Sequence, residues 1–334
     1  MAETRATAGA GPVKGDRVLV TGANGFIGSA VAMHLIQSGY HVVSLLRSCR
    51  GNKRLAKGTP FVMADIGQPL ASMLLHVLGA PAQWIVHIAA ETHVTRSIQD
   101  PEPFVRANVL GTMNVLDYAR RCAGELKGFI YFSTDEVFGP TAGAPVDDYA
   151  AFDARNPYAA TKAAGEELAM AYANTYGMPV TVTHCCNAFG EMQHAEKFVP
   201  LAVRAILGDL PLTLHKASGV GDGTARREWA YVGDVARAVA HVMALPDVAR
   251  VRYKYNIGCG HEASVLRVAQ WLAIALDTVL RYEIVEPTDR PGNDECYRSD
   301  CRRFLATGFQ QGGQFVEALN RTAQWYRDNP HWLR

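Results

Sequence analysis

Short runs of apolar residues recur along the first half of the chain, and stretches with helical spacing separate them. Uninterrupted apolar runs are typical of parallel strands buried on both faces of a sheet, whereas apolar positions three and four residues apart indicate an amphipathic helix. The predicted strands are Arg17–Thr21, His41–Leu46, Phe61–Ala64, Trp84–Ile88, Gly128–Phe132 and Val180–His184. The predicted helices are Phe26–Gln37, ending at Ser38-Gly39, and roughly 68–78, 102–122 and 158–176. This alternation predicts an α/β fold with a Rossmann-type, doubly wound parallel sheet.

The pattern changes after about residue 187, where polar and glycine-rich stretches separate the apolar segments. Helices are predicted near 196–208, 233–244, 264–277 and 313–327, with a strand near Tyr253–Ile257 and a glycine-rich loop at Ser218–Thr224. We therefore expect three parts in the chain. They are a flexible tail at 1–15, a Rossmann domain at 16–186 that also includes about 228–258, and a smaller C-terminal lobe at 187–227 and 259–334.

Composition argues against several classes of protein. The chain has 334 residues, 49% of them apolar and 19% charged, and its formal net charge of +1 lacks the basic surplus typical of nucleic-acid-binding proteins. Its seven cysteines include no Cys-x-x-Cys pair, which argues against a disulfide framework and a structural zinc site. Apolar runs such as Trp84–Ala90 are too short to cross a bilayer, and the polar N-terminus is unlike a signal peptide. We expect a cytoplasmic protein with no metal, nucleic-acid or membrane partner.

The segment TGANGFIG, residues 21–28, lies between the first predicted strand and the first predicted helix. Glycine permits a tight turn and a close approach of backbone N–H groups to a pyrophosphate, whose charge the helix N-terminus favours. The alternative is a tight turn without a ligand, and the position directly after the first strand argues against it. The residues predicted to contact a dinucleotide are Gly22, Asn24, Gly25, Phe26, Ile27, Gly28, Arg47, Asp65, Ile66 and Ala89, together with Tyr158 and Lys162.

Arg47 stands at the end of the second strand, where dinucleotide-binding proteins commonly carry an acidic residue. A carboxylate there binds the ribose 2′-hydroxyl, whereas an arginine accommodates a 2′-phosphate and can bind it with two hydrogen bonds. Arg47 therefore favours NADP over NAD, the alternative being that it and the basic residues after it form a solvated loop. Asp65, after the third strand, either accepts a hydrogen bond from the adenine or caps the next helix.

Tyr158 and Lys162 form a Y-x-x-x-K pair on the predicted helix 158–176. Residues four apart lie on one helix face, about 5–6 Å apart at Cβ. A nearby ammonium favours the tyrosinate, so we expect Lys162 to lower the pKa of Tyr158. Such a tyrosine can take a proton from a sugar or alcohol hydroxyl while hydride leaves carbon for a nicotinamide.

The segment Ser133–Glu136 directly follows the apolar run GFIYF, at the edge where α/β sheets place their chemistry. Thr134 is positioned to hydrogen-bond the reacting oxygen beside Tyr158. Asp135 and Glu136 offer an acid and a base, provided that their surroundings separate their pKa values. The alternative is that Asp135 begins a turn and Glu136 is solvated, but the position at a strand end favours the chemical role.

These motifs resemble the extended short-chain dehydrogenase/reductase superfamily and, within it, the nucleotide-sugar 4,6-dehydratases such as the dTDP-glucose and UDP-glucose enzymes. The resemblance runs from about residue 17 to the C-terminus. It rests on TGANGFIGS, HIAAETHVTRSI, NVLGT, STDEVFG, NPYAATKAAGEEL, CCNAFGEMQHAEKFVP, RREWAYVGD, YNIG and DRPGND. The discriminating motif is STDEV, because related epimerases usually lack the Asp-Glu pair and related decarboxylases keep only the glutamate.

The resemblance implies a role for each catalytic residue. Tyr158 would be the base that oxidises C4 of the hexose, assisted by Thr134 and Lys162. Glu136 would remove the C5 proton, and Asp135 would protonate the C6 hydroxyl as water departs. Hydride would return from the reduced cofactor to C6. The product would be an NDP-4-keto-6-deoxyhexose, with no net consumption of a tightly held nicotinamide cofactor.

The resemblance also implies a substrate site and an assembly. The substrate-binding residues would be Glu91 and Thr92 at the hexose, Asn187 near the sugar phosphate, Glu196, Lys197 and Pro200 on the nucleotide side, Arg227 and Arg290 at the diphosphate, and Asn256 in YNIG. The C-terminal lobe would then bind the nucleotide sugar. Enzymes of this kind pair through two long helices per subunit, here 102–122 and 158–176, so we expect a homodimer.

The sequence departs from the family pattern at several positions. The segment after the second strand is short, and His215–Val220 lengthens a loop that borders the expected nucleotide pocket. Arg-Glu-Trp at 227–229 replaces Arg-Asp-Trp, Asn293 replaces a usual histidine, and Asn156 replaces a usual serine. The nucleotide base and the hexose therefore stay open.

Two alternatives to a 4,6-dehydratase follow from the sequence. One is another enzyme on the same scaffold, either an NDP-sugar epimerase or a dehydratase acting at other carbons. The other is a non-catalytic module that binds a dinucleotide to sense redox state, which the intact Thr-Tyr-Lys set disfavours.

Overall fold

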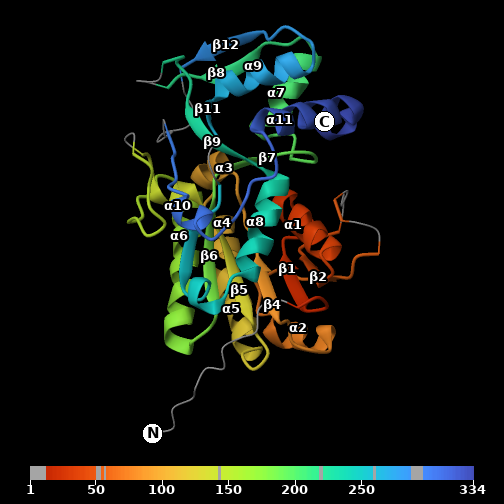
Figure 1. The fold of residues 1–334 in the computed structure, drawn as a ribbon, viewed down its shortest axis with the longest axis vertical. Helices are drawn as coiled ribbons and strands as arrows, with labels where there is room; N and C mark the ends of the chain where they lie inside the picture. The colour runs from red at the N-terminus through yellow and green to blue at the C-terminus, as the bar shows by residue number, and fades with distance from the viewer. Residues whose placement is uncertain are drawn as a thin grey trace.

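The structure is a computed structural model, and it describes residues 13–49, 54–55, 58–141, 144–217, 221–258, 261–286 and 296–334 (Figure 1). Within these ranges the main element is a seven-stranded parallel sheet with the strand order β10-β6-β5-β4-β1-β2-β3. Its strands are β1 (Arg17–Thr21), β2 (His41–Leu46), β3 (Phe61–Met63), β4 (Trp84–His87), β5 (Gly128–Thr134), β6 (Val180–Cys185) and β10 (Tyr253–Asn256). The predicted α/β fold class is confirmed, and residues 1–12 of the predicted tail lie outside the described ranges.

Helices cover both faces of this sheet. Side chains alternate along a strand, so in β1 Val18 and Val20 face one layer and Leu19 faces the other. The first layer contains α1 and α8, which pack against each other, and the second contains α2, α5 and α6. These helices are α1 (Phe26–Gln37), α2 (Ala71–Leu78), α5 (Gly111–Arg121), α6 (Pro157–Tyr176) and α8 (Val232–Ala244). Burial on both faces explains why the strands are apolar without interruption.

The predicted helix 102–122 is interrupted in the structure. It consists of α4 (Glu102–Phe104), a π-helical turn η1 (Val105–Leu110) and α5. The buried Asn108 lies in this π turn, and its side-chain amide donates to the Glu91 carbonyl (3.0 Å) and to the Thr161 hydroxyl (2.9 Å). Such wide turns occur frequently at functional sites, and this one carries a polar residue between the loop after β4 and helix α6.

A second core lies in the smaller lobe at the top of Figure 1. Its strands form a three-stranded sheet, β11-β9-β7, and a two-stranded ribbon, β12-β8. The bounds are β7 (Asn187–Phe189), β8 (Leu212–His215), β9 (Arg226–Tyr231), β11 (Glu262–Ser264), β12 (Tyr282–Val285), α7 (Phe198–Leu207), α9 (Val265–Ala275) and α11 (Phe315–Asp328). The strands of this lobe were not predicted, because runs of three to six residues with mixed polarity carry little periodic signal.

Several short elements complete the fold. They are α3 (Val94–Gln99), α10 (Arg302–Leu305) and the 3₁₀ turns η2 (Asp135–Phe138), η3 (Asp247–Ala249) and η4 (Pro330–Leu333). Of the predicted glycine-rich loop, residues 218–220 lie outside the described ranges. In the part of the chain that the structure describes, no helix has both the length and the apolar character needed to span a membrane.

The strand order determines where the polar loops meet. Strand β1 pairs with β2 on one side and with β4 on the other. The chain therefore builds the sheet outward from β1 through β2 and β3, and then in the opposite direction from β4 onward. Ligands of doubly wound sheets bind in the crevice at such a reversal, beyond the carboxyl ends of the strands. The loops after β1, β4 and β5 lie at this edge and carry many of the predicted site residues.

Candidate active site

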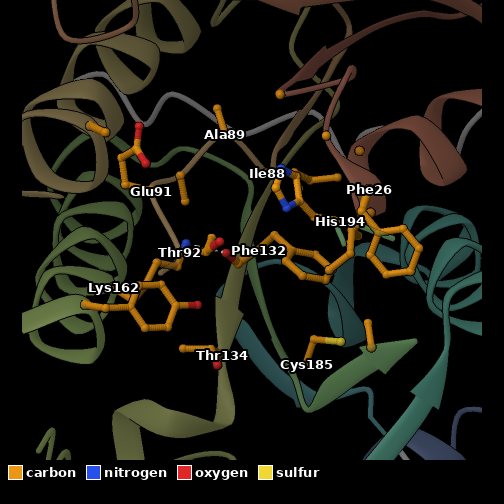
Figure 2. Close-up of a pocket in the computed structure, with 18 of the residues that line it drawn as sticks. Phe26, Ile88, Ala89, Glu91, Thr92, Phe132, Thr134, Lys162, Cys185 and His194 are labelled. Atoms are coloured by element: carbon orange, nitrogen blue, oxygen red, sulfur yellow. Dashed lines mark hydrogen bonds between the residues drawn. The ribbon is translucent and has the colours of Figure 1, made fainter. Parts of the chain in front are cut away.

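A cavity of about 590 Å³ lies at the carboxyl ends of the central strands (Figure 2). It brings together the predicted residues Gly22, Asn24, Gly25, Phe26, Ile27, Gly28, Arg47, Asp65, Ile66, Ala89, Glu91, Thr92, Thr134, Asp135, Glu136, Tyr158, Lys162, Asn187, Glu196 and Lys197. In Figure 2, Lys162 and Glu91 lie on one side of the view and Phe26 and His194 on the other. Residues from more than half of the chain length therefore converge on one space.

The glycine loop has the geometry that a bound pyrophosphate requires. Gly22 has a φ of +68°, and a Cβ there would lie 2.8 Å from the Cα of Ala89, so only glycine fits. A Cβ at Gly28 would lie 2.2 Å from the carbonyl oxygen of Gly22, which explains the close packing of helix α1 on the loop. Helix α1 begins without a side-chain cap and without an acidic residue in its first turn. Its first N–H groups thus remain available to an anion.

Arg47 forms an ion pair across the cavity. Its Nη1 lies 2.7 Å from Oε1 of Glu91, in the loop after β4, and Arg96 lies 4.0 Å from the other carboxylate oxygen. Two hydrogen bonds between the Glu91 backbone and the side chain of Asn108 fix this loop. Glu91 therefore compensates the positive charge at the position where a 2′-phosphate was predicted to bind.

Tyr158, Thr134 and Lys162 are all buried at the wall of the cavity. The Thr134 hydroxyl, at the end of β5, hydrogen-bonds the Tyr158 side chain. Burial, reinforced by the negative charge of Glu136, raises the pKa of Tyr158 far above its ordinary value. The expected lowering of the Tyr158 pKa by Lys162 is therefore not found, because burial is the largest influence and the charge of Glu136 adds to it.

The ammonium of Lys162 points to the strand beside it. Its Nζ donates a hydrogen bond of 2.6 Å to the Phe132 carbonyl and lies 4.4 Å from the centre of the Tyr131 ring. Burial lowers the pKa of Lys162 to about 7, and the carboxylate of Glu166 acts in the opposite direction. Protonation of this lysine is thus finely balanced at neutral pH.

Asp135 and Glu136 occupy different environments although they are neighbours. Asp135 is 4% exposed, and its Oδ1 accepts a hydrogen bond from the Thr134 hydroxyl (3.2 Å), while Oδ2 has no hydrogen-bond partner among the described residues. Burial, together with the charges of Glu136 and Glu228, raises the pKa of Asp135 to about 8. Asp135 is therefore a neutral acid at pH 7, with a proton to donate.

Glu136 is more accessible and is held by an amide. The Nδ2 of Asn156 donates to Oε2 of Glu136 (3.3 Å), and the Oδ1 of Asn156 caps helix α6 by accepting from the Ala159 N–H (2.9 Å). The same residue thus orients the carboxylate and begins the helix that carries Tyr158. The two adjacent carboxyls therefore have the different surroundings that a division of work between an acid and a base requires.

Three predicted substrate residues lie outside the cavity lining. Pro200 is buried in α7, and Asn256 is fully buried, with its amide donating to the carbonyls of Val146 and Asp300. Arg227 stacks over the ring of Tyr297, outside the cavity lining, although its positive charge acts on Asp135. Arg290 lies outside the described residues.

Several residues of the site were not assigned a role from the sequence. Asn108 and Asn156 hold the Glu91 loop and the Glu136 carboxylate, and the Asn-Pro start of helix α6 was the local signal for Asn156. Cys185 and His194 line the cavity, and Nδ1 of His194 lies 3.7 Å from Glu196. Among the described residues, no three His, Cys, Asp or Glu side chains are placed to hold a metal ion.

Comparison with known proteins identifies the family. Residues 18–258 match the model of the NAD dependent epimerase/dehydratase family. The chain belongs to this family. Its membership confirms the resemblance to extended short-chain dehydrogenases/reductases, and the glycine loop and Y-x-x-x-K pair described above lie within the matched residues.

Individual relatives are similar over nearly the whole chain. A dTDP-glucose 4,6-dehydratase from Streptomyces antibioticus is 36% identical over 329 residues, which cover 94% of this chain and 93% of the relative. The crystal structure of a dTDP-glucose 4,6-dehydratase from Streptomyces venezuelae, solved with NAD bound, has a TM-score of 0.81 and 34% identity over 95% of this chain and 98% of its own. A UDP-glucose 4-epimerase from Thermus thermophilus, also in complex with NAD, has a TM-score of 0.84 and 28% identity over 93% of this chain and 99% of its own. The chain is thus an enzyme of the extended type with a nicotinamide cofactor.

Proposed function

We propose that this protein is an NDP-hexose 4,6-dehydratase that converts an NDP-glucose-type sugar to an NDP-4-keto-6-deoxyhexose. The observation that carries the proposal is the pair Asp135 and Glu136 at the end of β5, one a neutral buried acid and the other a carboxylate held by Asn156. The names of the relatives, several of them dTDP-glucose 4,6-dehydratases at 32–36% identity, support it.

The first step concerns the hydroxyl at C4. Tyr158 accepts the proton of this hydroxyl. The Thr134 hydroxyl, which hydrogen-bonds the Tyr158 side chain, orients the reacting oxygen. Lys162 supplies the positive charge that stabilises the tyrosinate. A nicotinamide cofactor held at the glycine loop would supply the hydride acceptor for C4 and, later, the hydride donor for C6. Acid–base help of this kind is worth about 10²–10⁴-fold in rate.

The second step removes water across C5 and C6. The C5 proton is acidic once C4 is a ketone, and Glu136 removes it. Asp135 donates its proton to the departing C6 hydroxyl, which needs the protonated form that burial maintains. When C6 is reduced, Glu136 returns a proton to C5 after exchange with solvent. The proton that Tyr158 took from the C4 hydroxyl passes through solvent to Asp135, so all three residues regain their starting states.

The nucleotide side of the substrate lies, in this proposal, against the smaller lobe. Asn187, Glu196 and Lys197 line the cavity there, and the charge of Arg227 reaches its wall. A cation near the carboxyl pair suits a diphosphate group. Thr92 faces the hexose from the loop after β4.

The experiment that tests the function is incubation of the protein with NDP-glucose substrates in D₂O. We expect one of dTDP-, UDP-, CDP- or GDP-glucose to give a 4-keto-6-deoxy product that carries solvent deuterium at C5, detected by NMR and mass spectrometry. A product that keeps its C6 hydroxyl would instead show an epimerase, a reaction to which the T. thermophilus neighbour's name refers. Absence of any reaction with all four sugars would contradict the proposal.

We propose NAD rather than NADP as the cofactor. Solved neighbours contain NAD, and the ion pair with Glu91 compensates the charge of Arg47. The preference for NADP drawn from Arg47 did not take this carboxylate into account. In this proposal Glu91 acts at the cofactor as well as beside the hexose.

Replacing Glu91 by glutamine is expected to move the preference toward NADP. Loss of the carboxylate leaves the charge of Arg47 available to a 2′-phosphate, and an exposed charge pair of this kind changes the ratio of NAD to NADP affinities by about fivefold. Competitive exchange of the two cofactors into the purified protein, read by mass spectrometry, measures the ratio. Glu102→Gln is the matched control, since Glu102 pairs with Arg106 on an exposed helix. An unchanged ratio in Glu91→Gln would argue against this role.

We also propose that the protein forms a homodimer through helices α5 and α6. The adjoining turn η1 exposes two large apolar side chains, Val105 (45% exposed) and Leu110 (41%), as expected of a face that a second subunit covers. Light scattering after size-exclusion chromatography distinguishes a dimer from a monomer.

A further inference from the structure

A buried cluster of ionisable side chains joins helix α6, which carries Tyr158, to strands β6 and β10. Oε2 of Glu166, on α6, is 3.0 Å from Nε2 of His184 on β6, and Oε1 is 2.9 Å from Nζ of Lys254 on β10. The side chains of Glu166 and His184 are both 0% exposed and that of Lys254 is 12% exposed. The reaction steps proposed above use none of these three residues.

Glu166 occupies the helical position one turn beyond Lys162. Both side chains are buried, and residues four apart share a helix face, with Cβ atoms about 5–6 Å apart. Tyr158 lies eight residues from Glu166, about 12 Å away along the helix axis. The carboxylate is therefore much closer to the lysine than to the tyrosine. Its negative charge stabilises an ammonium at Lys162 more than it destabilises a tyrosinate at Tyr158.

Other charged or titratable groups surround this pair on every side. Lys162 faces Tyr158 on its own helix, Tyr131 on β5 and His87 on β4. Glu166 faces His184, Lys254 and Tyr131. Further out, Glu167 lies 3.9 Å from Lys254, and Asp148, which is paired with Arg303, lies near His184.

Burial creates a difficulty that the catalytic pair must overcome. It lowers the pKa of Lys162 and raises that of Tyr158, so the pair gives up its first proton from the lysine. In the arrangement left by that loss, a neutral lysine beside a neutral tyrosine, Tyr158 still holds its own proton and cannot itself act as the base. A negative charge close to Lys162 favours the arrangement with an ammonium and a tyrosinate. Although burial acts against it, His184 and Lys254 lower the pKa of Glu166 and so keep it charged.

We propose that Glu166 is a positioning residue whose buried carboxylate holds the proton of the catalytic pair on Lys162, so that Tyr158 serves as the base. The inference rests on the proposed function for its consequence in catalysis. The contacts of Glu166 with His184 and Lys254 keep the carboxylate charged and fixed. If the cluster only supports the fold, removing either partner of the Glu166–Lys254 ion pair should have the same effect. If the proposal holds, only removal of the negative charge of Glu166 should affect Lys162.

The test compares three variants with the wild-type protein. Glu166→Gln removes the negative charge, Lys254→Met removes the positive partner but keeps the carboxylate, and the double variant removes the pair together. The double variant guards against misfolding, because replacing both members of a buried ion pair by neutral residues avoids an unpaired charge. Glu166→Asp keeps the charge and serves as the rescue.

Two measurements decide the question. Competitive acetylation of Lys162 at a series of pH values, followed by peptide mass spectrometry, gives the midpoint of its titration in the purified protein without need of turnover. The midpoint should fall in Glu166→Gln and in the double variant, and should stay or rise in Lys254→Met. With the active NDP-hexose, kcat should fall about tenfold in the first two variants, with little change in KM, and recover in Glu166→Asp.

The outcomes separate the two proposals. Equal midpoints in wild type and Glu166→Gln, or equal losses of kcat in Glu166→Gln and Lys254→Met, would show that the cluster only supports the fold and would overturn the inference. Wild-type protein without turnover on any NDP-hexose would instead overturn the proposed function, and the acetylation midpoints would still report on Glu166.

Discussion

Replacing Tyr158 by phenylalanine is expected to reduce formation of the 4-keto-6-deoxy product by about 10²–10⁴-fold. The variant loses only the phenolic oxygen, which the Thr134 hydroxyl contacts at the wall of the cavity. Without that oxygen, no group in this position takes the proton from the C4 hydroxyl. Product formation under saturating NDP-hexose, followed by NMR, measures the loss.

The matched control is Tyr172→Phe. Tyr172 lies on the same helix, α6, and hydrogen-bonds Asp117 (3.1 Å) away from the cavity. Its replacement should leave turnover within about twofold of the wild-type value, since it removes only a half-buried hydrogen bond outside the cavity lining. Retention of the cofactor by Tyr158→Phe, checked by mass spectrometry, excludes a loss of binding. Unchanged turnover in Tyr158→Phe would favour a non-catalytic module that binds the dinucleotide.

The second large effect is expected when the two carboxyls are replaced one at a time. Glu136→Gln should lower both product formation and deuterium incorporation at C5 by about 10²–10⁴-fold, since no carboxylate then removes the C5 proton. Asp135→Asn should lower product formation to a similar extent, because an amide cannot protonate the departing hydroxyl. Deuterium incorporation in single-turnover experiments distinguishes the two roles. Equal incorporation in both variants would contradict the assignment of base and acid.

The pH dependence of the wild-type enzyme should reveal the acid. Asp135 must be protonated, and its pKa is about 8, so product formation should fall as the pH rises above about 8. Each further pH unit should cost about tenfold in rate while the fold persists. A profile that stays flat to pH 10 would show that Asp135 is not the proton donor.

The buried Asp135 should also lower the free energy of unfolding of the protein near neutral pH. The pKa of Asp135 rises from 3.8 to about 8 on folding, so between these values the unfolded chain ionises while the folded protein keeps the proton. Folding therefore loses stability as the pH rises through this window, and Asp135→Asn lacks the penalty. At pH 7.5 the free energy of unfolding of Asp135→Asn should exceed that of wild type by on the order of 5 kcal/mol, with little difference near pH 4. Urea unfolding at the two pH values tests this.

How much of the site the sequence predicted depends on the range of the interactions. The glycine loop and the helix after it matched their predicted bounds, because a strand, a tight turn and a helix N-terminus are local features. The Tyr158–Lys162 spacing and the carboxyls at a strand end were also readable, since helix periodicity and strand length place them. The short strands of the smaller lobe escaped prediction, because pairing with distant partners defines them more than their own composition does.

The sequence by itself determined the layered α/β architecture, because strand and helix periodicity are local. It also named the candidate catalytic residues, through the spacing of their motifs together with the family resemblance. Only the tertiary structure decided how those residues are charged. Contacts between segments far apart in the chain place Glu91 against Arg47, bury Asp135 near Glu228, and set His184 and Lys254 against Glu166. Burial and distant charges control the pKa of a side chain, and neither can be computed from the order of residues alone.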